Sequence, residues 1–243
     1  MSIDALTRLG ELCPSLAKGR IDVVVYGMTD ETGGRALLRL RLPSTPPAVD
    51  IRFFITCSLK GAHARALASE LVRAAEEADE RALSQSESDT IFDYAGPSVS
   101  LFLVECRLSG EAKRVIADAL LYPTALQKLV IFGKAWTDAG AAALANALRH
   151  EDCFLIMLVI REPGSVSDEA WEDFASGVAL NKSIECIFIK CEMSTRCAAA
   201  LVAALRVNTK LYRLTLSGSD LSGVPENVLA ELRADRRVKL GDN

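Results

Sequence analysis

The sequence predicts an α/β solenoid of about seven strand–helix units, with a curved parallel sheet on the concave side and helices on the convex side. Two observations predict this fold. Pairs of large apolar residues separated by one spacer recur along the chain, and most pairs precede an Ala- and Leu-rich stretch. The first members of successive pairs lie 28, 50, 28, 29, 29 and 27 residues apart. One strand and one helix in a repeating unit of about 20–50 residues is typical of a solenoid.

The strand pairs define the units in order along the chain. They are Val23/Val25, Ile51/Phe53, Leu101/Leu103, Leu129/Ile131, Leu158/Ile160, Ile187/Ile189 and Leu214/Leu216. Helices are predicted over 62–82, 112–121, 139–148, 169–180, 196–206 and 225–234. The long interval of 50 residues contains one period and about 22 extra residues, which predicts an insertion over 74–96.

The two ends of the chain are predicted to cap the stack. Residues 1–19 contain Ile3, Leu6 and Leu9 at helical spacing, which indicates an amphipathic N-terminal capping helix. The repeats then run over 20–217. Residues 218–243 form a C-terminal cap in which Pro225 lies in the first turn of a helix and cations lie toward its end.

Several segments carry a further resemblance. From Leu126 onward, an apolar residue lies three positions before each strand pair, and in SVSLFLVECRL (98–108) a cysteine lies two before the closing Leu108. Together with TDAGAAALANAL, STRCAAALVAAL and LNKSIECIFI, this frame resembles the ribonuclease-inhibitor-like leucine-rich repeats over roughly residues 20–240. The family places Asn or Cys near the end of each strand segment, whereas this chain has Lys134 and Ser219 there.

Composition excludes several classes of partner. The formal net charge is −4 and no apolar stretch reaches the length of a membrane-spanning helix, so neither nucleic acid nor a membrane is expected as a partner. Seven cysteines without a C-x-x-C pair, and an N-terminus unlike a signal peptide, favour free thiols and a reducing, cytoplasmic location.

No catalytic or cofactor site is expected. The glycine-rich GMTDETGG contains acids that repel phosphate, and neither dinucleotide nor P-loop glycine spacing occurs. The only histidines, His63 and His150, lie near helix ends without a nucleophile at a motif spacing. The cysteines at 186, 191 and 197 lack metal-site spacing, and we expect them to pack in turns and helices. We therefore expect no enzyme activity, cofactor, metal or small-molecule substrate.

The strand residues that point away from the helices are the predicted binding surface. In the repeat frame they form an apolar stripe with basic residues toward the C-terminal units, and exposed apolar patches commonly mark interfaces. The predicted partner-binding residues are Phe102, Val104, Val130, Phe132, Val159, Arg161, Phe188, Lys190 and Arg213. The alternative is that Val and Phe occupy these positions only because they favour strands.

The insertion 74–96 is predicted to be either disordered or regulatory. It contains seven acids and one arginine. The regulatory hypothesis is that Ile91, Phe92 and Tyr94 pack against the sheet edge or the apolar stripe, and that Ser84 and Ser86, each with an acid three residues later, are phosphorylated.

These features predict a non-enzymatic protein–protein interaction module, an adaptor or structural subunit of a larger assembly. The second hypothesis is an enzyme inhibitor, which the family resemblance implies. The basic residues beside the apolar stripe, however, do not suit a basic target enzyme. The third is a cytoskeletal or axonemal binding protein, because ALRVNTKLYRLTL and the C-terminal cap resemble the tropomodulin C-terminal repeat domain.

Overall fold

The structure is a computed structural model that describes residues 20–25, 50–55, 61–62, 64–69, 72, 99–104, 108–121, 126–133, 136–164 and 166–241. Its strands are β1 (Arg20–Val25), β2 (Asp50–Ile55), β3 (Val99–Val104), β4 (Leu126–Phe132), β5 (Met157–Arg161), β6 (Cys186–Lys190), β7 (Arg213–Thr215) and β8 (Val238–Lys239). Its labelled helices are α4 (Gly110–Ala119), α5 (Asp138–Arg149), α6 (Asp168–Leu180), α7 (Thr195–Val207) and α8 (Glu226–Ala234). The predicted N-terminal capping helix, residues 1–19, lies outside the described residues.

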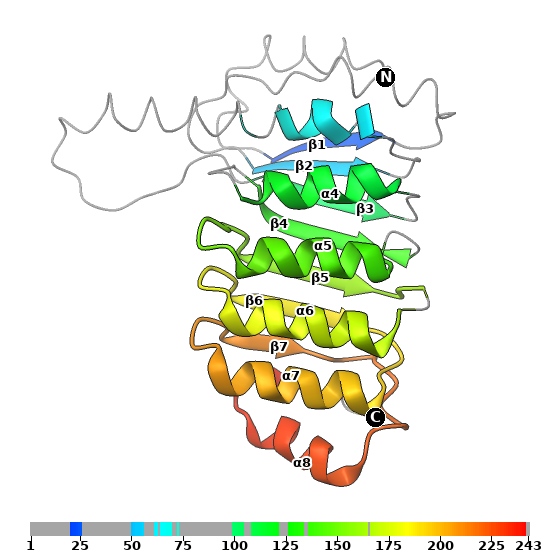
Figure 1. The fold of residues 1–243 in the computed structure, drawn as a ribbon, viewed down its shortest axis with the longest axis vertical. Coiled ribbons are helices and arrows are strands. Elements are labelled where there is room, and N and C mark those ends of the chain that lie inside the picture. Colours follow the sequence, from blue (N-terminus) through cyan, green and yellow to red (C-terminus); the bar gives the residue numbers. More distant parts are fainter. Residues whose placement is uncertain are drawn as a thin grey trace, which may run out of the picture.

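All the strands belong to one parallel sheet, and their spatial order follows the chain from β1 to β8. Figure 1 shows the labelled helices stacked in one layer in front of this sheet. This arrangement confirms the predicted α/β class and parallel sheet. Sequential neighbours, with one helix between successive strands from β3 to β8, are also compatible with a solenoid.

The register corrects one prediction. Phe53, rather than Ile51, lies opposite both Val23 and Leu101. The second unit is therefore displaced by two residues. The interval between the first and second units is two residues longer than predicted, and the next interval, which contains the insertion, is two residues shorter. Alternating strands look the same after a shift of two residues, so periodicity alone could not fix this register. The eighth strand, β8, was not predicted, because its two residues were assigned to the cap.

Each of the helices α4 to α7 begins at a hydroxyl N-cap. The side chains of Ser109, Thr137, Ser167 and Ser194 accept a hydrogen bond from the backbone N–H three residues later. Such caps satisfy an N–H group that has no partner inside the helix. Cationic side chains then join neighbouring helices on the outer surface, as Arg196 does with Glu169 and Glu172.

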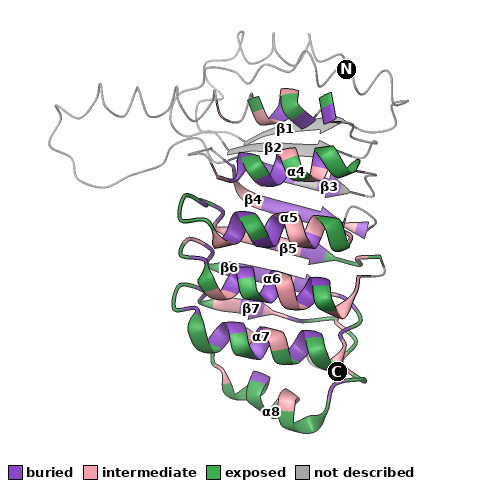
Figure 2. Ribbon diagram, in the orientation of Figure 1, coloured by how far each residue is buried: buried purple, intermediate pink, exposed green. Residues whose placement is uncertain are grey.

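The core lies between the helices and the sheet, where buried residues line the inner side of each helix (Figure 2). The predicted inward pairs from Leu101/Leu103 to Leu214/Leu216 are all buried, which confirms this part of the repeat frame. Between α5 and α6 the helices approach closely at Gly177, where an added Cβ would lie 2.7 Å from the carbonyl oxygen of Ala145. Only glycine fits this contact without moving the backbone.

Three aromatic side chains form a cluster in the middle of the stack. Trp136, Trp171 and Phe174 have ring centroids 5.5–5.9 Å apart, and Phe174 contacts both tryptophans edge-on. These distances lie in the range in which aromatic pairs attract. The cluster joins α6 to the segment between β4 and α5 and so contributes to the packing between consecutive units.

A ladder of asparagines, which we name the asparagine ladder (Asn181 and Asn208), joins the C-terminal ends of the helices. Asn208 Nδ2 donates to the carbonyl of Val178 at 2.6 Å and to that of Asn181 at 2.9 Å. Its Oδ1 accepts from the N–H groups of Lys210 and Leu211 at 2.8 and 2.7 Å. Asn181 makes the corresponding bonds one unit earlier, to the carbonyl of Leu148 and from Ser183 and Ile184.

The last unit continues this pattern with a different residue. The Arg237 guanidinium donates to the carbonyl oxygens of Asn208, at 2.7 Å, and of Leu205. Asp235 holds the guanidinium in place through both carboxylate oxygens. Arg237 thus reaches the carbonyls of Leu205 and Asn208, which are equivalent to those of Val178 and Asn181 that Asn208 reaches one unit earlier, so the ladder continues into the cap.

Candidate binding face of the sheet

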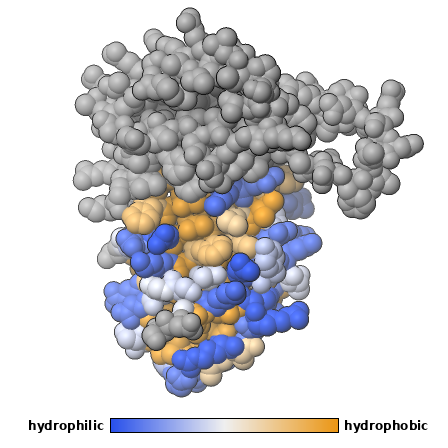
Figure 3. Space-filling view, turned by 180° about the vertical axis from the view of Figure 1, so that it is seen from behind, coloured by the Kyte–Doolittle hydropathy of each residue, from blue (hydrophilic) through white to orange (hydrophobic). Residues whose placement is uncertain are grey.

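The sheet face opposite the labelled helices is the candidate site, and we call its part over β4 to β8 the open sheet face. In Figure 3 this side shows apolar surface in the middle and hydrophilic surface at the borders. From β4 to β8, strand alternation and register place twelve positions on it: Lys128, Val130, Phe132, Met157, Val159, Arg161, Cys186, Phe188, Lys190, Arg213, Thr215 and Lys239.

The middle row of this face runs across the strands. Val130 pairs with Val159, Val159 with Phe188, and Phe188 with Thr215. Val159 and Phe188 are partly exposed, as predicted, whereas Val130 is only 8% exposed. The prediction that Val130 is a surface residue is therefore wrong. Its short side chain lies about 4.8 Å from each neighbouring strand, so adjacent side chains cover most of it.

Basic residues occupy both borders of the middle row. Arg161 and Lys190 are adjacent on β5 and β6, and Arg213 lies on the other border. The guanidinium of Arg161 lies 5.8 Å from the ring centroid of Phe132, within the range of a cation–π contact. Lys190 Nζ lies 3.0 Å from Glu162 Oε1, so this cation is already paired.

Sequence reasoning missed four positions of the open sheet face. Lys128, Met157, Cys186 and Lys239 belong to it by register, and Lys239 extends the middle row beyond Thr215. Extending the strand alternation by two residues toward the N-terminus would have found the first three. Lys239 could not be found in this way, because β8 was not predicted.

Several predicted site residues lie outside the described part of the chain. The side chains of Phe102 and Val104 are among these, although the register places Phe102 opposite Val130 and Val104 opposite Phe132. The same holds for the whole of 74–96, with its predicted regulatory residues Ser84, Ser86, Ile91, Phe92 and Tyr94, and for His63.

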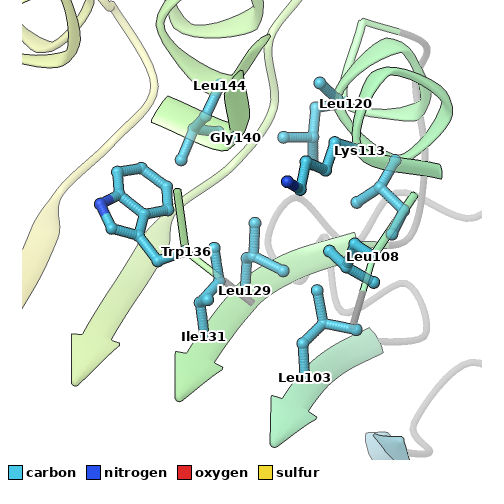
Figure 4. Close-up of a pocket in the computed structure, with 11 residues that line it drawn as sticks. Leu103, Leu108, Lys113, Leu120, Leu129, Ile131, Trp136, Gly140 and Leu144 are labelled. Atoms are coloured by element: carbon cyan, nitrogen blue, oxygen red, sulfur yellow. The ribbon is translucent and has the colours of Figure 1, made fainter. Parts of the chain in front are cut away.

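A small cavity lies between α4, α5 and the strands β3 and β4 (Figure 4). Its volume is about 30 Å³, and apolar side chains such as Leu129, Ile131 and Leu144 line it. The amine of Lys113 points among them and donates to Thr137 Oγ1 at 2.7 Å, and burial lowers the pKa of this lysine. The volume is enough for about two water molecules, so the cavity is too small for a cofactor.

The reactive residue types noted in the sequence do not form a site in the described part of the chain. Cys191 and Cys197 are buried in the core, as predicted, and His150 is exposed at the end of α5 with Nδ1 3.4 Å from Asp152 Oδ2. Among the described residues, no group of three His, Cys, Asp or Glu side chains is arranged to hold a metal ion. Within the same residues, no helix is long and apolar enough to cross a membrane.

The buried thiols lead to a prediction about reactivity. Burial raises the pKa of Cys153 and Cys197, and it raises that of Cys191 to about 11. At pH 8 only about one Cys191 thiol in a thousand is then a thiolate, the form that reacts. We expect these three cysteines to resist alkylation by iodoacetamide in the native protein at pH 8 and to react fully in urea. Peptide mass spectrometry would measure this, and rapid native labelling of Cys197 would contradict it.

Comparison with known proteins adds no relative for this chain. No protein-family model matches the chain, and no curated protein matches it in sequence.

Proposed function

We propose that this chain is a ribonuclease-inhibitor-like leucine-rich-repeat protein that binds a protein partner through the open sheet face, as an adaptor or structural subunit and not as an enzyme. The observation that carries the proposal is the partly exposed middle row of this face. Parallel sheets are usually covered on both faces. Here the helices cover one face, while Val159 and Phe188 on the other remain partly accessible.

The repeat assignment rests on spacing and packing. The aligned buried residues Leu129, Leu158, Ile187 and Leu214 occur at intervals of 29, 29 and 27 residues, and each unit adds one strand and one helix. Hydrogen bonds between equivalent positions of neighbouring units, as in the asparagine ladder, are a further feature of repeat proteins that stack unit on unit.

Replacement of Phe188 by aspartate tests the proposal. A carboxylate in the middle row must be desolvated on binding, so we expect Phe188→Asp to lose the partner while keeping the helical circular dichroism of the wild type. Leu180→Asp is the matched control, because Leu180 is apolar and 56% exposed but lies at the end of α6.

The measurement is quantitative mass spectrometry of proteins that co-purify with tagged full-length chains from the native source. The supporting result is a stoichiometric protein present with the wild type and with Leu180→Asp but absent with Phe188→Asp. Loss with Leu180→Asp and retention with Phe188→Asp would instead place the interface at the helix ends and overturn the proposal.

A further inference from the structure

The open sheet face has an unbalanced charge. Of its twelve positions on β4 to β8, Lys128, Arg161, Lys190, Arg213 and Lys239 are basic and none is acidic. This contrasts with the whole chain, whose formal net charge is −4. The excess of acids therefore lies elsewhere, and a partner that approaches this face encounters cations around an apolar row.

Three of these cations are available to a partner. Arg161, Arg213 and Lys239 form no ion pair with any carboxylate in the described part of the chain, whereas Lys190 is paired with Glu162. Arg161 and Lys239 are exposed and Arg213 is half-buried. A partner carboxylate at these positions gains an attractive contact without first displacing an internal one.

The dimensions of the face match those of a helix. The border rows that contain Arg213 and Arg161 are four residues apart along the strands, which corresponds to about 13 Å. An α-helix with its side chains is about 10–12 Å wide, so it fits between these rows. Its pitch of about 5.4 Å is close to the strand spacing of about 4.8 Å, so successive turns can lie over successive strands.

We infer that the partner segment is an amphipathic α-helix that lies across β4 to β7, with apolar residues over the middle row and acidic residues on both flanks. This inference rests on the proposed function, for which it specifies the partner. The apolar stripe covers Val159 and Phe188, and the flanking carboxylates reach Arg161 on one border and Arg213 on the other. A nucleic-acid backbone suits the face less well, because phosphates cannot cover the apolar row.

Binding of two designed peptides to the full chain tests the inference. Both carry the same leucine stripe at helical spacing and a fluorescein label; one has glutamates on both flanks and the other has lysines. By fluorescence anisotropy at low salt we expect the glutamate peptide to bind at least about tenfold more tightly than the lysine peptide. We also expect this preference to shrink in about 500 mM NaCl.

Charge reversal supplies the matched variants. Arg161→Glu combined with Arg213→Glu should remove or invert the preference for the glutamate peptide. Lys182→Glu combined with Lys210→Glu changes the net charge equally at exposed residues outside the open sheet face, and should leave the preference unchanged.

The outcomes separate this inference from the proposed function. If both peptides bind with equal affinity, and Arg161→Glu combined with Arg213→Glu does not change this, the inference that the partner helix has acidic flanks is overturned. Binding of a partner to the apolar row would still stand. No binding of either peptide at about 1 mM, or tighter binding of a single-stranded oligonucleotide, would overturn the helical partner. The Phe188→Asp co-purification result judges the proposed function independently of these measurements.

Discussion

Replacement of Asn208 by alanine should lower the free energy of unfolding by about 2–4 kcal/mol. The side chain is buried and makes four hydrogen bonds, two as donor to Val178 and Asn181 and two as acceptor from Lys210 and Leu211. Alanine leaves these backbone groups without their partners, and the bonds to Val178, Asn181 and Leu211 are buried. The cost of desolvated, unpaired groups is larger than the net contribution of a typical exposed hydrogen bond.

Urea unfolding followed by circular dichroism would measure this change. Thr209→Ala is the matched control, because Thr209 is the next residue and is exposed, and we expect it to change stability by less than about 0.5 kcal/mol. If Asn208→Ala is as stable as the wild type, the ladder does not hold the units together. Asn181→Ala should behave like Asn208→Ala, since Asn181 makes the equivalent bonds one unit earlier.

Replacement of Phe174 by alanine should cost about 3–5 kcal/mol of stability, the largest effect of any single core substitution proposed here. Phe174 is fully buried and packs edge-on against Trp136 and Trp171, with centroids 5.5 and 5.8 Å away. Alanine leaves a cavity and removes both aromatic contacts.

Thermal unfolding by circular dichroism and by tryptophan fluorescence would test this expectation, because the two tryptophans of the chain are the partners of Phe174. Phe154→Ala is the control, since the same residue type is 47% exposed there. We expect Phe174→Leu, which keeps most of the volume, to lie between the two. Equal stability of Phe174→Ala and Phe154→Ala would contradict the assignment of this cluster to the core.

Much of the candidate site followed from the alternation of residues within the strands. Val159, Phe188, Arg161 and Lys190 were assigned to the outer face because Leu158/Ile160 and Ile187/Ile189 had to face the helices, and the structure places them so. Val130 was assigned by the same rule and is nearly buried. Alternation specifies the face on which a side chain lies but not how far its neighbours cover it.

The sequence by itself determined the repeating strand–helix order, the parallel sheet and the inward residues. Each unit must bury one apolar face, and this requirement imposes a spacing of apolar residues that can be read from one sequence. Only the tertiary structure decided the register of β2, the eighth strand and the contacts between units. The asparagine ladder illustrates the reason. The repeat frame assigned no role to Asn181 and Asn208, because their role depends on carbonyl groups that come within hydrogen-bonding distance only when one unit stacks on the next.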